Sequence, residues 1–172
     1  DGFVGKLDVN GNLLWLKRIG GSGFDVARDV RLTNSGDILV TGYFQADVDL
    51  GGGFSLELED TMDQNAYVVR MDPAGNTLWA QNLGGSGPDL GVAVDEDAAG
   101  YIYAVGTFAA TGQFGQVSAT ALGGEDVYLL RMNADGAVYA ANEITNLASV
   151  HVWPNPANAK FNVQFDLKTP SD

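Results

Sequence analysis

The chain has 172 residues, of which 22 are acidic and 9 are basic, so its formal net charge is −13 at pH 7. This excess argues against nucleic acid binding, because contacts to phosphates need clustered Lys and Arg. The sequence contains no cysteine and no apolar run near the length of a membrane span, which excludes a disulfide framework, a thiol nucleophile and a transmembrane helix. Its 23 glycines and 45% hydrophobic content fit a turn-rich β protein with a packed core.

The first predicted element is a β-hairpin over residues 1–19. Phe3, Gly5 and Leu7 alternate with a face that carries Lys6, and a period of two is typical of a strand. The turn-forming stretch DVNGN follows and leads into the apolar run LLWLKRI. Two strands joined by a tight turn form a hairpin.

Residues 20–44 add two more predicted strands after the turn GGSG. The apolar runs 26–32 and 38–44 are separated by the turn NSGD. Gly42 lies inside the second run, at a place where we expect two backbones to approach closely. Because short turns join all these runs, they favour an antiparallel meander.

The same arrangement returns further along the chain. The stretch 65–87 repeats the first copy at an offset of 64 residues, as from Trp15 to Trp79. A third copy opens at Asp126 with an offset three residues shorter, and in it Ala140 stands where a third Trp would lie. Self-similarity at a fixed period predicts one structural unit stacked on copies of itself.

Four-stranded antiparallel sheets repeated along a chain suggest the blades of a β-propeller, in which each sheet packs face to face on its neighbours. The predicted fold is therefore all-β, with a half blade at 1–19, a blade at about 25–83 and a blade at about 89–144. A β-solenoid and a row of small sandwiches stay open as alternatives. A closed ring needs ~4 to 8 blades, so we expect more of them in the intact protein.

Two stretches carry a resemblance to a known family, namely DGFVGKLDVNGNLLWLKRIGGSGFD and NAYVVRMDPAGNTLWAQNLGGSGPD. They resemble the β-propeller repeats of bacterial secreted and surface proteins. The resemblance covers about residues 1–144 and includes Trp15, Trp79, both GGSG turns and their spacing. It implies a partial β-propeller and an extracellular location, either secreted or on the cell surface.

The composition changes from Ser149 onward. Apolar residues alternate from Phe161 to Leu167, which predicts a half-buried strand. The stretch VWPNPANAKFNVQF resembles the opening of the C-terminal sorting domain of Bacteroidetes proteins, an Ig-like β-sandwich recognised by the type IX secretion system. The resemblance implies a linker at 145–149, a truncated sorting domain at 150–172 and the type IX secretion machinery as a partner.

Two oxygen-rich stretches have the spacing of cation ligands. Asp47, Asp49 and Gly51 form a D-x-D-x-G string of the kind that calcium loops use, but a solvated acidic loop explains them better. The stretch 8–12 offers alternating oxygens, yet its glycine recurs in the other copies while its oxygens do not, which favours a hairpin turn. We expect no metal or cofactor site, with calcium at 47–51 as the alternative.

The sequence predicts no catalytic residues. The GGSG turns lack the third glycine and the Gly-Lys-Ser of phosphate-binding loops, so they are interpreted as turns. Glu57 and Glu59 would share one face of a short strand, and a solvated face explains them better than an acid/base pair. His151, the only histidine, belongs to a different module from either GGSG serine, which argues against a Ser-His-Asp triad.

Aromatic residues of the repeats have two interpretations. Trp15 and Trp79 could stack on sugars, but their repeated positions inside strands favour packing between blades. Weaker candidates for ligand contact are four aromatic residues expected to be exposed near strand ends: Tyr43, Phe44, Tyr101 and Phe108.

The predicted function is that of a non-catalytic scaffold, secreted or on the cell surface, that is exported by type IX secretion. Its loops would bind a surface protein or glycan, as in adhesion. The alternative is a fragment of a secreted propeller hydrolase or lyase whose catalytic residues lie outside this chain, and a third interpretation is a spacer. Neither a nucleic acid partner nor a membrane span is expected.

Overall fold

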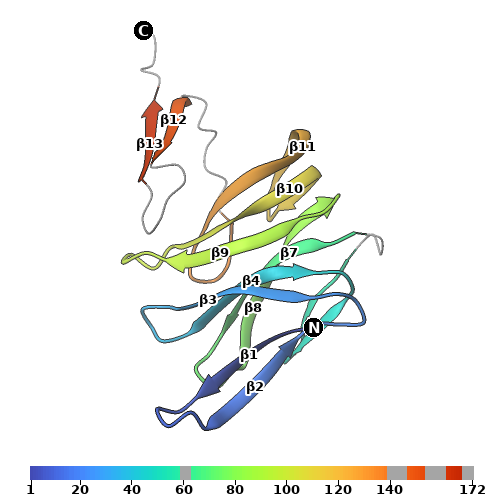
Figure 1. Ribbon diagram of the computed structural model, residues 1–172, viewed down its shortest axis with the longest axis vertical. Helices are drawn as coiled ribbons and strands as arrows, with labels where there is room; N and C mark the ends of the chain where they lie inside the picture. The colour runs from blue at the N-terminus through green and yellow to red at the C-terminus, as the bar shows by residue number, and fades with distance from the viewer. Residues whose placement is uncertain (59–62, 139–146, 154–161, 168–172) are drawn as a thin grey trace. The chain divides into compact units, whose positions relative to one another are not determined.

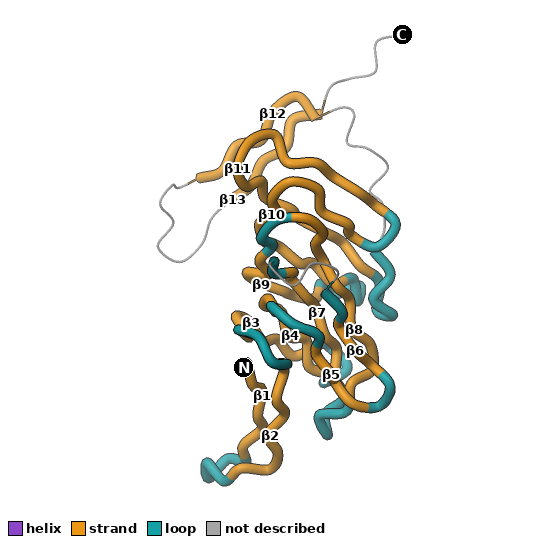
Figure 2. Tube along the Cα trace, turned by 90° about the vertical axis from the view of Figure 1, so that its right-hand side faces the viewer, coloured by secondary structure: helices purple, strands orange, loops and turns teal. Residues whose placement is uncertain are grey.

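The computed structural model of the chain describes residues 1–58, 63–138, 147–153 and 162–167, the last two ranges by their backbone. These residues form strands joined by turns and loops (Figure 2). None of the described residues belongs to a helix long and apolar enough to cross a membrane. The chain divides into two compact units, residues 1–139 and 140–172.

The first unit consists of three repeats, which we call A, B and C (Figure 1). All their paired strands are antiparallel, which confirms the predicted all-β antiparallel fold, and the four strands of repeat B follow the order β3-β4-β7-β8 expected for a meander. Repeat A contains β1 (Gly2–Leu7) and β2 (Leu13–Ile19). Repeat B contains β3 (Val26–Leu32), β4 (Ile38–Phe44), β7 (Asn65–Met71) and β8 (Thr77–Ser86), with the hairpin β5 (Val48–Gly51) and β6 (Phe54–Leu56) between β4 and β7. Repeat C contains β9 (Leu90–Glu96), β10 (Ile102–Phe114) and β11 (Val117–Met132).

Main-chain pairing joins repeat B to repeat C. Strand β10 continues past Phe108, the counterpart of the last residue of β4 at the offset of 64, and the residues from Thr111 to Phe114 pair with the end of β8. Phe114 anchors this extension, because its ring packs on Phe108 and Tyr128 at centroid distances of 5.4 and 5.0 Å. The segment after Phe108 is therefore part of a long β10–β11 hairpin.

Two apolar cores lie between successive repeats. One contains residues of repeats A and B, such as Ile19 and Val69, and the other contains residues of repeats B and C, such as Val68 and Ile102. Strand β7 contributes to both cores, and all seven of its residues are buried. The sheet of repeat B is thus packed on both faces, so the repeats stabilise one another by burying apolar surface.

A tryptophan on the last strand of one repeat contacts a turn of the next repeat. The Trp15 indole nitrogen Nε1 donates a hydrogen bond to the Pro73 carbonyl at 3.2 Å. One repeat later, Trp79 Nε1 donates to the Ala134 carbonyl at 2.9 Å. Both rings are half-buried, so the two tryptophans pack between repeats rather than standing free for a ligand.

The same two carbonyls accept a second hydrogen bond from a basic side chain. Lys6 Nζ donates to the Pro73 carbonyl at 3.1 Å, and Arg70 Nη1 donates to the Ala134 carbonyl at 2.8 Å. Arg70 is only 8% exposed, and its Nη2 also pairs with Asp37 Oδ2 at 2.8 Å. Each turn carbonyl is therefore held by two donors from the preceding repeat.

The second unit contains β12 (Leu147–Trp153) and β13 (Asn162–Leu167), which pair antiparallel with Val150 opposite Phe165. The strand predicted from the alternation that ends at Leu167 is present. Strand β12 begins at Leu147, within the segment predicted as a linker. One strand pair is common to many β folds, so the Ig-like sorting domain stays a prediction.

Replacing Trp79 with Ala should lower the free energy of unfolding by about 2 to 4 kcal/mol, because a half-buried ring and its hydrogen bond to the next repeat are lost. Urea unfolding followed by circular dichroism measures this cost. The matched control is Leu78→Ala on the same strand, where the side chain is 43% exposed and the cost should stay below about 1 kcal/mol. Small and equal costs would contradict the packing role and favour the sugar-stacking interpretation.

Candidate functional site

Each GGSG turn is closed by a buried aspartate. The Asp89 carboxylate accepts hydrogen bonds from the backbone amides of Gly85, at 2.8 Å, and Ala109, at 3.2 Å. Asp25 makes the two equivalent contacts one repeat earlier, at 3.0 and 3.1 Å. The backbone amide of Gly87 donates to the Asp63 carboxylate. In a phosphate-binding loop, backbone amides like these would bind the anion. Here they already donate to protein carboxylates, so the GGSG glycines form a turn and not an anion site.

The carboxyl group of Asp89 titrates unusually. Burial raises its pKa from 3.8 to about 6, against the lowering effect of the amides of Gly85 and Ala109, and the nearby charge of Asp63 adds to the rise. Because burial disfavours the charged carboxylate, Asp89 keeps its proton to a higher pH in the folded protein than in the unfolded chain. We therefore expect the stability of the contact between repeats B and C to depend on pH.

The stability of the protein should fall as the pH rises from about 4.5 to about 7. The folded protein holds the Asp89 proton more tightly than the unfolded chain does, so the stabilisation is complete below pH 3.8 and is lost as the pH passes about 6. We expect a loss on the order of 2 kcal/mol. The variant Asp89→Asn, which cannot titrate, should show a flatter profile in the same urea unfolding series. Parallel profiles for the two proteins would contradict this assignment.

The carboxylates of the acidic stretch 47–51 accept hydrogen bonds from nearby backbone amides. Asp47 Oδ1 accepts a hydrogen bond from the Leu58 amide at 2.9 Å, and Asp49 Oδ1 accepts one from the Gly51 amide at 2.8 Å. The part of the chain that the structure describes contains no cluster of three or more Asp, Glu or His side chains that could hold an ion. The geometry therefore gives the calcium alternative no support.

The stretch 8–12 forms the turn of the β1–β2 hairpin. Asp8 Oδ1 accepts hydrogen bonds from the backbone amides of Asn10 and Asn12, both at 2.8 Å. Asp72 makes the same contacts one repeat later. The side-chain hydrogen bond from Asn12 and the backbone bonds lower the pKa of Asp8, which keeps the carboxylate charged. These oxygens are engaged in fixing the turn.

Two of the aromatic candidates are not exposed. Phe44 and Phe108 are buried in the two cores, so the prediction that they contact a ligand from exposed strand ends was wrong. The physical reason is that β4 and β10 lie inside a sheet with further repeats packed on it. Tyr43 and Tyr101 are half-buried and lie against basic groups, with Arg28 at 5.4 Å and Arg131 at 4.5 Å from the ring centroids.

The remaining candidates are not brought together. Glu57 is exposed beyond β6, and its Oε1 accepts a hydrogen bond from Ser55 at 3.4 Å. Its predicted partner, Glu59, lies outside the described residues. His151 lies on β12 in the second unit, opposite Gln164. No acid/base pair or triad follows from these positions in the described residues.

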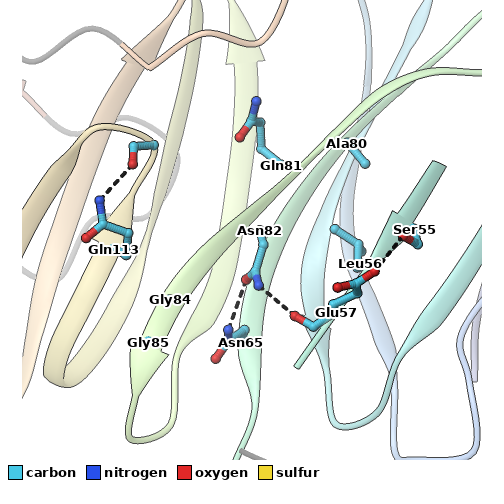
Figure 3. A pocket seen from close by; sticks show the side chains of 11 residues that line it. Ser55, Leu56, Glu57, Asn65, Ala80, Gln81, Asn82, Gly84, Gly85 and Gln113 are labelled. Atoms are coloured by element: carbon cyan, nitrogen blue, oxygen red, sulfur yellow. Dashed lines mark hydrogen bonds between the residues drawn. The ribbon is translucent and has the colours of Figure 1, made fainter. Parts of the chain in front are cut away.

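A cavity of about 760 Å³ is present between β6, β8 and the β10–β11 hairpin (Figure 3). Four amide side chains line it, and no basic residue is among the residues around it. The half-buried Ala80 adds a small apolar surface, and Leu56, Gly84 and Gly85 belong to the lining as well. The amides are those of Asn65, Gln81, Asn82 and Gln113.

Hydrogen bonds fix part of this amide lining (Figure 3). Asn65 Nδ2 donates to Asn82 Oδ1 at 3.0 Å, and Asn82 Nδ2 donates to the Glu57 carbonyl at 2.9 Å. Gln113 Nε2 donates to the Gly115 carbonyl at 2.7 Å. Asn65 is 4% exposed, yet its Oδ1 has no hydrogen-bond partner. No sequence motif contains this site, because its amides come from separate segments of the chain.

The chain resembles a known repeat protein. No family model matches it. Among curated proteins, the uncharacterized WD repeat-containing protein L264 of Acanthamoeba polyphaga mimivirus is 33% identical over 112 residues, which make up 62% of this chain and 8% of that protein. The chain thus spans less than a tenth of the relative it matches. Together with the stacked antiparallel sheets, this similarity supports a propeller-like repeat protein.

Proposed function

We propose that the protein is a non-catalytic β-propeller scaffold, secreted or on the cell surface, that binds a protein or glycan. Residues 150–172 would be the start of a sorting domain that directs its export by type IX secretion. The observation that supports a binding scaffold is that the contacts between repeats recur, whereas the amides that line the cavity between repeats B and C are replaced by charged residues at the equivalent positions one repeat earlier. A rigid frame with a variable surface is the usual design of repeat proteins that bind.

The recurring contacts extend beyond the tryptophans and aspartates. The Tyr67 hydroxyl donates to the Val26 carbonyl at 3.1 Å, and the Tyr128 hydroxyl donates to the Leu90 carbonyl at 3.3 Å. A glycine beside each tyrosine leaves room for this approach, since a Cβ on Gly42 would come within 3.0 Å of the Tyr67 hydroxyl. The tyrosines and glycines therefore hold the strands of each repeat together, whereas the amides that line the cavity have no counterparts in the preceding copy.

Further repeats would complete the scaffold. Phe3 is 69% exposed although its counterpart Tyr67 is fully buried, and Val127 is 71% exposed although its counterpart Ala66 is fully buried. The outer faces of repeats A and C therefore expose residues whose counterparts in repeat B are buried against a neighbouring repeat. We propose that the intact protein covers them with more repeats of the same kind in a ring of ~4 to 8 blades.

The proposed function predicts saturable binding of the purified protein to envelope fractions from its own source cells. Pretreating the envelope with periodate should abolish binding if the receptor is a glycan, and pretreating it with protease should abolish binding if the receptor is a protein. An antibody against the chain should detect the native protein in the envelope or the medium. Absence of saturable binding, or a native protein confined to the cytoplasm, would contradict the proposal.

A further inference from the structure

We propose that the cavity between repeats B and C binds a neutral oligosaccharide. The amides of Asn65, Gln81, Asn82 and Gln113 would contact the sugar hydroxyls. This inference rests on the binding function proposed above and assigns its ligand class and its place on the molecule.

The four amides replace four charged residues of the preceding repeat. The two settings are structurally equivalent, because Gly21 faces the Asp47 carbonyl just as Gly85 faces the Thr111 carbonyl, in each case leaving no room for a Cβ. At the offset of 64 residues, the positions taken by Asn65, Gln81, Asn82 and Gln113 are occupied in the earlier copy by Asp1, Lys17, Arg18 and Asp49.

The fold therefore does not require amides at these positions. Asp1 Oδ2 and Arg18 Nη1 form an ion pair at 3.4 Å in the place where Asn65 and Asn82 form their amide hydrogen bond. The change from charged groups to amides keeps polar side chains in place while removing their charge. A surface altered in this way suits a ligand that is polar and uncharged.

The chemistry of the lining favours a sugar over other ligands. Each amide presents one donor group and one acceptor, which matches neighbouring hydroxyls that both donate and accept. The exposed Glu57 and the net charge of −13 disfavour phosphates and acidic sugars. The half-buried Ala80 offers a small apolar surface to the CH groups of a sugar ring. A volume of about 760 Å³ is typical of a site for a ligand of several rings.

A nuclear magnetic resonance titration tests the proposal. The ¹⁵N-labelled protein is titrated with neutral hexasaccharides of glucose, mannose, xylose and galactose, and with oligogalacturonic acid as the acidic control. At least one neutral hexasaccharide should shift the side-chain amide signals of Asn65, Gln81, Asn82 and Gln113 saturably, and the acidic control should not. No shift with any neutral hexasaccharide, or shifts confined to other residues, would overturn the proposal.

The double variant Asn65→Asp with Asn82→Arg is the matched test of the site. It builds into repeat B the ion pair that repeat A already holds and leaves the net charge unchanged, so the fold should be retained, as circular dichroism would show. We expect the affinity for the neutral hexasaccharide to fall at least ~10-fold, which corresponds to about 1.4 kcal/mol. Gln116→Ala, exposed on the β10–β11 turn outside the cavity lining, should bind like the wild type.

The outcomes separate this proposal from the broader function. An unchanged affinity in the folded double variant would overturn the site, while envelope binding would still support the scaffold. Envelope binding that is lost after protease treatment but not after periodate would overturn the sugar as ligand and leave a protein-binding scaffold. Loss of binding in the double variant alone, with Gln116→Ala unaffected, supports both the site and the ligand class.

Discussion

One backbone carbonyl per repeat, at Pro73 and at Ala134, fixes how the next sheet packs. Each receives an indole N–H and a basic side chain from the preceding repeat, and these donors come from two different strands. Because the two donors lie on neighbouring strands, they fix both the orientation of the turn and its distance from the preceding sheet. The apolar cores lie between the same sheets, and the cavity between repeats B and C lies beside β8.

Much of the fold could be predicted from the sequence because its signals are local. Alternation with a period of two and short glycine turns identify most strands, and the offset between Trp15 and Trp79 identifies the repeat. The burial of Phe44 and Phe108 could not be predicted in this way, since it depends on a second sheet packed over strands that look like edges. The continuation of β10 to Phe114 likewise depends on pairing with β8 of another repeat.

The candidate site was harder to predict because no motif contains it. Its amides lie on β7, β8 and β10, and only the stacking of the repeats brings them to one cavity. A signal was nevertheless present in the offset itself, where charged residues of one copy stand opposite amides of the next. Asp25 and Asp89 are a similar case. The sequence shows that they occupy equivalent positions, but only the structure shows that they accept hydrogen bonds from the amides of the GGSG turns.

The contact between tryptophan and turn is tested most directly at the turn glycines. Gly11 and Gly136 share a φ near +85°, at 85° and 86°, but a Cβ at Gly11 meets nothing within 4 Å, whereas one at Gly136 would lie 2.8 Å from the Trp79 ring. The measurement is the free energy of unfolding of Gly136→Ala against Gly11→Ala, each with and without Trp79→Ala. We expect Gly136→Ala to cost about 1 to 3 kcal/mol more, and this excess to disappear without the ring. Equal costs for the two glycines in the presence of Trp79 would contradict the account.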